Sequence, residues 1–137
     1  MPFQPEVNLN SMNLALIAHD GKKPEMVAFV LQNKSMLMDA TLYATGTTGG
    51  HIERAGINVE RMLSGPKGGD AQIAAMVAEG RLDAVIFFRD PLDKHPHEPD
   101  VQMLMRLCDV YNVPLATNPA AANMMLAGLK AFAKSKL

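Results

Sequence analysis

The chain has 137 residues, a formal net charge of −1 and one cysteine. This length predicts a single domain over residues 1–137, and the near-neutral charge argues against a nucleic-acid or membrane-surface partner, which would require a concentrated basic surface. A lone cysteine cannot form an internal disulfide, no apolar run reaches the length of a membrane span, and the start lacks the regions of a secretory signal. We therefore expect a cytoplasmic protein.

Short apolar runs alternate with longer amphipathic stretches, which is typical of β–α units built around a parallel sheet. The predicted strands are 14–18, 41–45, 58–63, 84–88 and 113–117. The predicted helices are 24–38, 47–55, 70–79, 99–111 and 119–129, several of which begin with proline. The pattern predicts an α/β protein with a three-layer, doubly wound fold and a five-stranded, mainly parallel sheet.

Ligands of open parallel sheets bind beyond the carboxyl ends of the strands, where helix N-termini converge. The segments that follow the five predicted strands are HDGKK, TGTTGG, SGPKGGD, RDPLDKHPHEPD and TNPA. Nearly all of the chemically suggestive side chains therefore fall on one edge of the predicted sheet. We expect the functional site there.

The TGTTGG segment, residues 45–50, combines hydroxyl groups and glycines at a predicted helix start. Backbone N–H groups and the helix dipole favour an anion at such a place, and a phosphate fits the description. The segment matches neither the Walker pattern nor G-x-G-x-x-G, so nucleotide binding gains little support. The alternative is that Thr47 or Thr48 only caps the helix.

The SGPKGGD segment, residues 64–70, is a second glycine-rich turn at the same edge. Ser64 and the Gly65 amide could bind an oxygen-rich ligand. Asp70 stands where the next helix begins, and its position alone favours a helix cap. The functional alternative is a proton acceptor, because a carboxylate beside two anion-binding turns cannot assist binding by its charge.

Further ionisable residues follow the first and fourth predicted strands. Lys23 in HDGKK could neutralise a phosphate, while the neighbouring His19 and Asp20 could equally belong to a solvated turn. The DKHPHEPD segment, residues 93–100, is denser in histidine and acidic residues. Because no spacing there resembles a structural zinc motif, a histidine in proton transfer is favoured over a metal site. Cys108 is interpreted as a buried small apolar residue.

Six segments, AHDGKK, YATGTTG, MLSGPKGGD, VIFFRDP, HPHEPDV and VPLATNPA, together resemble the methylglyoxal synthase family. The resemblance runs from about residue 14 to residue 129, with the motifs in the family's order. It implies a cytoplasmic homohexameric lyase that converts dihydroxyacetone phosphate into methylglyoxal and inorganic phosphate without a metal or organic cofactor. Inorganic phosphate would be both a product and an inhibitor.

The resemblance also assigns roles, motif by motif. The substrate and phosphate contacts that it implies are His19, Lys23, Thr45, Gly46, Thr47, Thr48, Ser64 and Gly65. Asp70 would be the catalytic base and His97 would polarise the substrate oxygens. Supporting carboxylates near the site would be Asp20, Asp90 and Asp100.

These roles suit the chemistry, because removing a proton from a carbon next to a ketone requires a base and stabilisation of the enediolate oxygen. The alternative function is a non-catalytic regulatory module of the same fold that only binds phosphorylated ligands. Asp70 and His97 together favour the enzyme, since a pure binding site has no evident need for them.

The tail KAFAKSKL has no arginine after Arg106, which departs from family members with a longer C-terminal segment. Arg89 is given no role.

Overall fold

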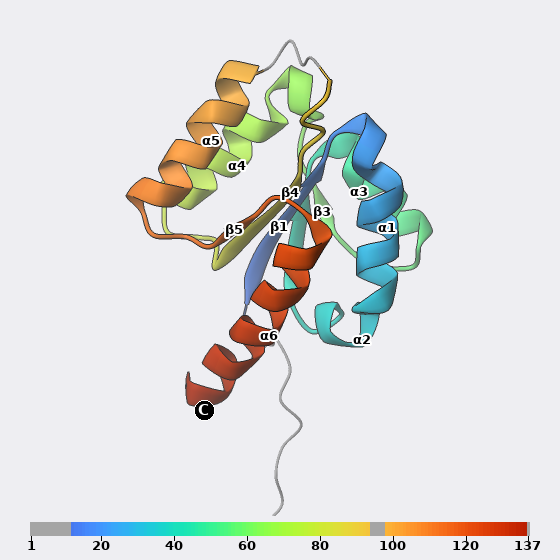
Figure 1. Cartoon of the computed structure of the whole chain (residues 1–137), viewed down its shortest axis with the longest axis vertical. Helices are drawn as coiled ribbons and strands as arrows, with labels where there is room; N and C mark the ends of the chain where they lie inside the picture. The colour runs from blue at the N-terminus through green and yellow to red at the C-terminus, as the bar shows by residue number, and fades with distance from the viewer. Residues whose placement is uncertain (1–11, 94–97, 137) are drawn as a thin grey trace, which may run out of the picture.

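The computed structural model describes residues 12–93 and 98–136 (Figure 1). Its strands are β1 (Asn13–Ala18), β2 (Thr41–Ala44), β3 (Glu60–Arg61), β4 (Ala84–Phe88) and β5 (Leu115–Ala116). Its helices are α1 (Lys23–Gln32), α2 (Lys34–Leu37), α3 (Gly46–Arg54), α4 (Gly69–Ala78), α5 (Glu98–Val110) and α6 (Pro119–Lys136). Single 3-10 turns form η1 (Asp20–Lys22) and η2 (Gly65–Lys67).

The described strands form one five-stranded sheet in the order β3-β2-β1-β4-β5, and every pairing is parallel. The chain moves from β1 outward to β3 and then crosses to β4 on the other side of β1. The order therefore reverses between β1 and β4, which is the point where ligands of such sheets bind. The predicted α/β, doubly wound fold is confirmed.

Helices cover both faces of the sheet. Figure 1 shows α4 and α5 on one side and α1 and α3 on the other, with α6 joining the second group. Alternate residues of β1 enter different cores: Leu14, Leu16 and Ala18 pack with α1, α3 and α6, while Ala15 and Ile17 pack with α4 and α5. This period of two is expected for a strand that is buried on both faces.

Four predicted elements differ clearly from the observed ones. The predicted strand 113–117 is observed only over Leu115–Ala116, and the predicted helix 119–129 continues to Lys136. The predicted helix 24–38 is broken at Asn33, whose φ of −113° and ψ of 21° leave the helical region. The Asn33 amide side chain donates to the Phe29 carbonyl at 2.9 Å and to Asn123 Oδ1 in α6 at 3.1 Å, so a side chain competes with the helical ladder there. The predicted strand 58–63 pairs only over Glu60–Arg61, both exposed at the sheet edge.

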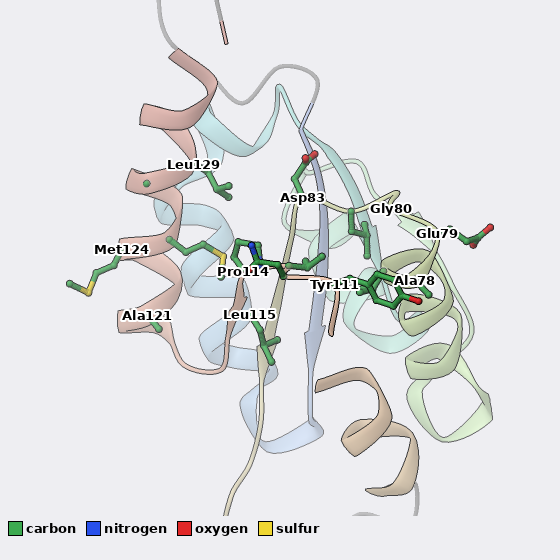
Figure 2. A pocket seen from close by; sticks show the side chains of 16 residues that line it. Ala78, Glu79, Gly80, Asp83, Tyr111, Pro114, Leu115, Ala121, Met124 and Leu129 are labelled. Carbon is green, nitrogen blue, oxygen red and sulfur yellow. The ribbon is translucent and has the colours of Figure 1, made fainter. Parts of the chain in front are cut away.

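No helix among the described residues is long and apolar enough to cross a membrane. A groove of about 1050 Å³ opens at the amino ends of the strands, where Leu82 and Asp83 precede β4 and Val113 and Pro114 precede β5. Figure 2 shows Pro114 and Leu115 lying between α6 and the segment that carries Tyr111. This mostly apolar groove lies at the end of the sheet opposite the polar turns.

Candidate functional site

The two glycine-rich turns predicted to bind an anion touch each other at the carboxyl ends of β2 and β3. The Gly46 N–H donates to the Leu63 carbonyl at 3.1 Å. A Cβ at Gly46 would come within 3.1 Å of the Ser64 nitrogen and 3.2 Å of the Met62 oxygen. Glycine at position 46 thus allows the start of α3 to approach the backbone that leads into η2.

Thr48 joins this pair of turns to the end of β1. Its hydroxyl oxygen accepts from the Ala18 N–H at 3.2 Å, lies 3.3 Å from the Ala18 carbonyl oxygen and accepts from the Thr45 hydroxyl at 3.3 Å. Thr47 and Thr48 lie inside α3, whose N-cap is Thr45, and no side-chain cap is found for this helix in the described part of the chain. The interpretation of Thr47 or Thr48 as a cap is therefore wrong.

Lys23 lies at the same edge, and only 7% of its surface is exposed. Its ammonium group donates to the Ala18 carbonyl at 2.7 Å and pairs with the Asp20 carboxylate at 3.0 Å. The Asp20 side chain is 97% exposed, so solvent screens this ion pair. The Ala18 carbonyl is a shared anchor, because both Lys23 and Thr48 contact it.

His19 lies at the reversal point between β1 and β4 and is buried. Its backbone N–H donates to the Phe88 carbonyl at 3.1 Å, and its Nδ1 accepts from the Asp90 N–H at 3.0 Å. The Phe87 ring stands edge-on to the imidazole with centroids 5.0 Å apart. An Nδ1 that accepts from an amide places the hydrogen of a neutral imidazole on Nε2, so His19 offers an N–H donor at that atom.

Asp70 is fully buried at the second position of α4. The N-cap is Gly68, with a φ of 108°, so the prediction that position favours Asp70 as a helix cap is wrong. A Cβ at Gly69 would lie 1.9 Å from the Leu63 oxygen, and the Gly69 N–H donates to the Ser64 carbonyl at 2.9 Å. Asp70 is thereby held directly beside the Ser64–Gly65 turn, which itself contacts Gly46.

Asp90 and Asp100 also occupy this end of the sheet. Asp90 follows β4, its Oδ1 accepts from the Leu92 N–H at 3.1 Å, and a Cβ at Gly21 would lie 2.6 Å from its Oδ2. Asp100 is half-buried in the first turn of α5. His97, for which a polarising role is predicted, lies outside the described residues, as does His95.

The structure gives Arg89 a partner, Glu98 of α5, with Nη2 and Oε1 3.3 Å apart. A cavity of about 320 Å³ beside it is lined by Lys22, Glu25 and Thr117, among others.

Within residues 12–93 and 98–136, no three His, Cys, Asp or Glu side chains are grouped so that they could hold a metal ion. The proposed metal alternative at DKHPHEPD falls partly outside those ranges.

Contacts therefore join the predicted residues into one continuous edge, from His19 through Thr48 and Gly46 to Ser64 and Asp70. The start of α3 contributes the Thr47 and Thr48 amides, which have no acceptor within the helix at its first turn. A buried ammonium group and helix-start amides suit a phosphate, and a buried carboxylate beside them suits proton transfer.

Three features of the edge are absent from the sequence-based prediction. Phe87 orients the His19 ring, Gly69 permits the approach of α4, and Arg61 donates from Nε to the Gly46 carbonyl at 3.1 Å. The sequence GGD at residues 68–70 offered a signal for Gly69. Nothing in the local sequence marks Phe87 or Arg61. Cys108 is buried as predicted, and burial, with a smaller effect of the Asp109 charge, raises the pKa of its thiol to about 11.

Comparison with known proteins identifies the family. The family model described as MGS-like domain matches residues 25–117. Methylglyoxal synthase from Cupriavidus taiwanensis is 57% identical over 130 residues, which cover 94% of this chain and 92% of that protein. Methylglyoxal synthase from Thermus thermophilus is 60% identical over 118 residues, 85% of this chain and 94% of that protein.

A solved structure agrees with these relatives. The crystal structure of methylglyoxal synthase from Elizabethkingia anophelis is 43% identical in sequence and superposes with a TM-score of 0.80, covering 88% of this chain and 79% of that one. The sequence relatives, the family model and the fold thus agree over most of the chain. The chain belongs to the methylglyoxal synthase family of lyases.

Proposed function

We propose that this protein is a methylglyoxal synthase that converts dihydroxyacetone phosphate into methylglyoxal and inorganic phosphate. The observation that carries the proposal is the fully buried Asp70 carboxyl, held by Gly69 beside a turn that contacts the start of α3. A base adjacent to an anion site is what proton abstraction from a phosphorylated ketone requires. The named relatives support the same activity.

The phosphate binds across the two turns. The Thr47 and Thr48 amides at the start of α3, the Ser64 hydroxyl and the Gly65 amide donate to its oxygens, and Lys23 supplies the positive charge. Lys23 is buried and held at the end of β1 by the Ala18 carbonyl, so little side-chain entropy remains to be lost on binding. Contacts to three elements fix the orientation of the phosphate ester.

The first chemical step is removal of a proton from the hydroxymethyl carbon by the Asp70 carboxylate. The electron pair of that C–H bond forms a carbon–carbon double bond as the carbonyl oxygen becomes an enediolate oxygen. His19 donates to the substrate from Nε2, since Nδ1 is engaged by the Asp90 amide. His97, in the role that the family resemblance implies, polarises the same group of oxygens.

The second step breaks the bond between carbon and the phosphate oxygen. The hydroxyl on the first carbon gives its proton to the departing phosphate and becomes the aldehyde oxygen, the double bond shifts towards the carbon that carried the phosphate, and inorganic phosphate leaves with the bonding pair. The proton taken by Asp70 is returned when the remaining enolate is protonated. The phosphate-binding turns stabilise the departing anion. The released enol then tautomerises to methylglyoxal, so no water, metal or organic cofactor enters the balance.

We propose a cytoplasmic homohexamer as the working assembly, with inorganic phosphate acting as an inhibitor as well as a product. The family resemblance supports the assembly, and exposed apolar residues such as Met124 and Tyr111 beside the groove of Figure 2 are compatible with subunit contacts. Light scattering coupled to size-exclusion chromatography tests it. A monodisperse monomer at micromolar concentration would contradict the hexamer.

The activity is tested by incubating purified protein with dihydroxyacetone phosphate and measuring methylglyoxal and inorganic phosphate together. Equal amounts of both products are expected. Accumulation of glyceraldehyde 3-phosphate would mean that the intermediate is reprotonated instead of losing phosphate, and the lyase assignment would be wrong. Binding of phosphoglycolate without any turnover would favour the regulatory module instead.

A further inference from the structure

Arg61, on the edge strand β3, contacts the predicted phosphate-binding turn from the side opposite to β1. Its Nε donates to the Gly46 carbonyl at 3.1 Å, and the Gly46 N–H is bonded to Leu63, two residues further along the same segment. Both polar groups of Gly46 are thus fixed by residues 61–63. Gly46 immediately precedes Thr47 and Thr48, whose amides are proposed to bind phosphate.

The Arg61 side chain also packs over two glycines of α3. A Cβ at Gly49 would lie 2.6 Å from Arg61 Cγ, and a Cβ at Gly50 would lie 3.3 Å from Arg61 Nη2. Both glycines have negative φ, so backbone conformation does not require them. The stem of Arg61 occupies the space that a side chain at Gly49 would need, and its guanidinium lies over Gly50.

We propose that Arg61 is a positioning residue that holds the first turn of α3 in the geometry that binds the substrate phosphate. This inference rests on the proposed function, since it concerns the same turn. Arg61 acts through Gly46 and the following amides and need not touch the ligand. Loss of the guanidinium removes the bond to the Gly46 carbonyl, so the Thr47 and Thr48 amides become less well aligned.

The competing explanation is that Arg61 only forms an ion pair at the protein surface. Its Nη1 lies 3.3 Å from Glu53 Oε1, and both side chains are about half exposed, so this ion pair alone would contribute little. The Nε bond to Gly46 and the packing over Gly49 are independent of Glu53. Substitutions can therefore separate the two roles.

The test measures the Kd of inorganic phosphate by titration calorimetry and the kinetics with dihydroxyacetone phosphate, both on the full chain. Arg61→Met keeps an unbranched stem over Gly49 and removes the guanidinium. We expect Kd and KM to rise by about three- to tenfold, the effect of losing one hydrogen bond, with kcat within about twofold, since phosphate contacts are made in both ground and transition states. The melting temperature should change little.

Two matched controls isolate the contact with Gly46. Glu53→Gln removes the ion pair but leaves the Nε bond, and Arg54→Met removes one positive charge from the end of the same helix, where Arg54 contacts His51. Both should bind phosphate as the unaltered chain does. A rise in Kd for Arg54→Met as large as for Arg61→Met would show that net charge alone matters and would overturn the proposal.

A double-mutant cycle gives a second, independent test. Gly49→Ala should displace the arginine stem and weaken phosphate binding, but should have little further effect when Arg61→Ala is already present. Equal effects of Gly49→Ala in both backgrounds, or an unchanged Kd for Arg61→Met, would contradict the positioning role. If the unaltered chain binds phosphate and these effects appear without methylglyoxal formation, the proposed function fails while the positioning role stands. If it binds no phosphate, both fail.

Discussion

The backbone N–H of Asp90 donates to Nδ1 of His19 at 3.0 Å, across 71 positions of sequence. This bond joins the segments that leave β1 and β4, the two strands between which the sheet order reverses. It also sets the tautomer of a buried histidine, because an acceptor Nδ1 leaves the hydrogen on Nε2. The fold therefore delivers a neutral N–H donor to the edge where the proposed phosphate-binding turns lie.

The tautomer of His19 predicts different effects for two amide substitutions. Glutamine can carry an N–H donor close to the position of Nε2, whereas asparagine is too short. We expect His19→Asn to lower kcat/KM by about 10- to 100-fold, as for a lost hydrogen bond to a charged group, and His19→Gln to retain more activity. Steady-state kinetics decide the matter, and an asparagine variant as active as the glutamine variant would argue against Nε2 as the donor.

We expect substitution of Gly69 to change the stability of the protein, and the effect can be compared with that of the same substitution at another helical glycine. An added Cβ would meet the Leu63 oxygen at 1.9 Å, so Gly69→Ala must push α4 away from the Ser64 turn. We expect the free energy of unfolding to fall by about 2 kcal/mol or more, in the range of overpacking, and turnover to fall with it. The control is Gly128→Ala in α6, where a Cβ meets nothing within 4 Å.

In that control, alanine should raise the free energy of unfolding by about 0.5–1 kcal/mol, because it is the better helix former. Urea unfolding of both variants provides the measurement. A Gly69→Ala protein as stable and active as the Gly128→Ala protein would mean that α4 does not need its close approach.

The raised pKa of the Cys108 thiol predicts a loss of stability in alkaline solution. Burial raises the pKa of this thiol to about 11 from its ordinary value of 9.0, so the unfolded chain loses the thiol proton first as pH rises. The stability contributed by the protonated thiol is fully present below pH 9 and is lost between pH 9 and about 11, with a slope of at most about 1.4 kcal/mol per pH unit. The quantity to measure is the slope of the free energy of unfolding against pH.

Cys108→Ala isolates this contribution. The variant should be less stable at neutral pH, because a small cavity remains, but its free energy of unfolding should fall less steeply above pH 9. Identical slopes for the two proteins would show that the thiol of Cys108 does not contribute.

Metal removal gives a prediction about the mechanism itself. Every proposed step is carried by a side chain or a backbone group, so formation of methylglyoxal should persist in excess EDTA. The assay compares initial rates before and after dialysis against the chelator. Activity that disappears and returns on addition of zinc would overturn the cofactor-free mechanism.

The sequence was sufficient to predict the sheet and the edge at which the polar turns meet. Strand 84–88 is apolar throughout and was predicted with its observed limits, because a strand buried on both faces has an unmistakable pattern. The polar turns follow strands that are parallel, so their meeting at one edge follows from topology. The break at Asn33 escaped prediction because its amide bonds to Asn123, a partner 90 positions away.

Contacts between distant segments account for the other differences. Position alone favoured Asp70 as a helix cap, whereas Gly68 takes that place and Asp70 is buried at the second position of α4. The glycines at 49 and 50 suggested room for an anion, yet the Arg61 side chain fills the space beside them. A local pattern cannot distinguish a glycine that admits a ligand from one that admits a side chain.

The most direct test of the account compares Asp70→Asn with Lys23→Met. Asparagine keeps the size of the buried side chain but cannot accept the substrate proton, so turnover of dihydroxyacetone phosphate should fall by about 10²- to 10⁴-fold, the usual contribution of a general base. Phosphoglycolate, a phosphate-bearing analogue, should still bind, and more tightly if a repulsive charge is removed. Lys23→Met should instead weaken phosphoglycolate binding, because it removes the charged partner of the phosphate.

The decisive measurement is the turnover of Asp70→Asn alongside its affinity for phosphoglycolate. The account predicts a protein that melts near the temperature of the unaltered chain and binds the analogue, yet forms methylglyoxal at least about a hundredfold more slowly. Near-normal turnover by a folded Asp70→Asn protein would contradict it, because the buried carboxylate would then not be the base.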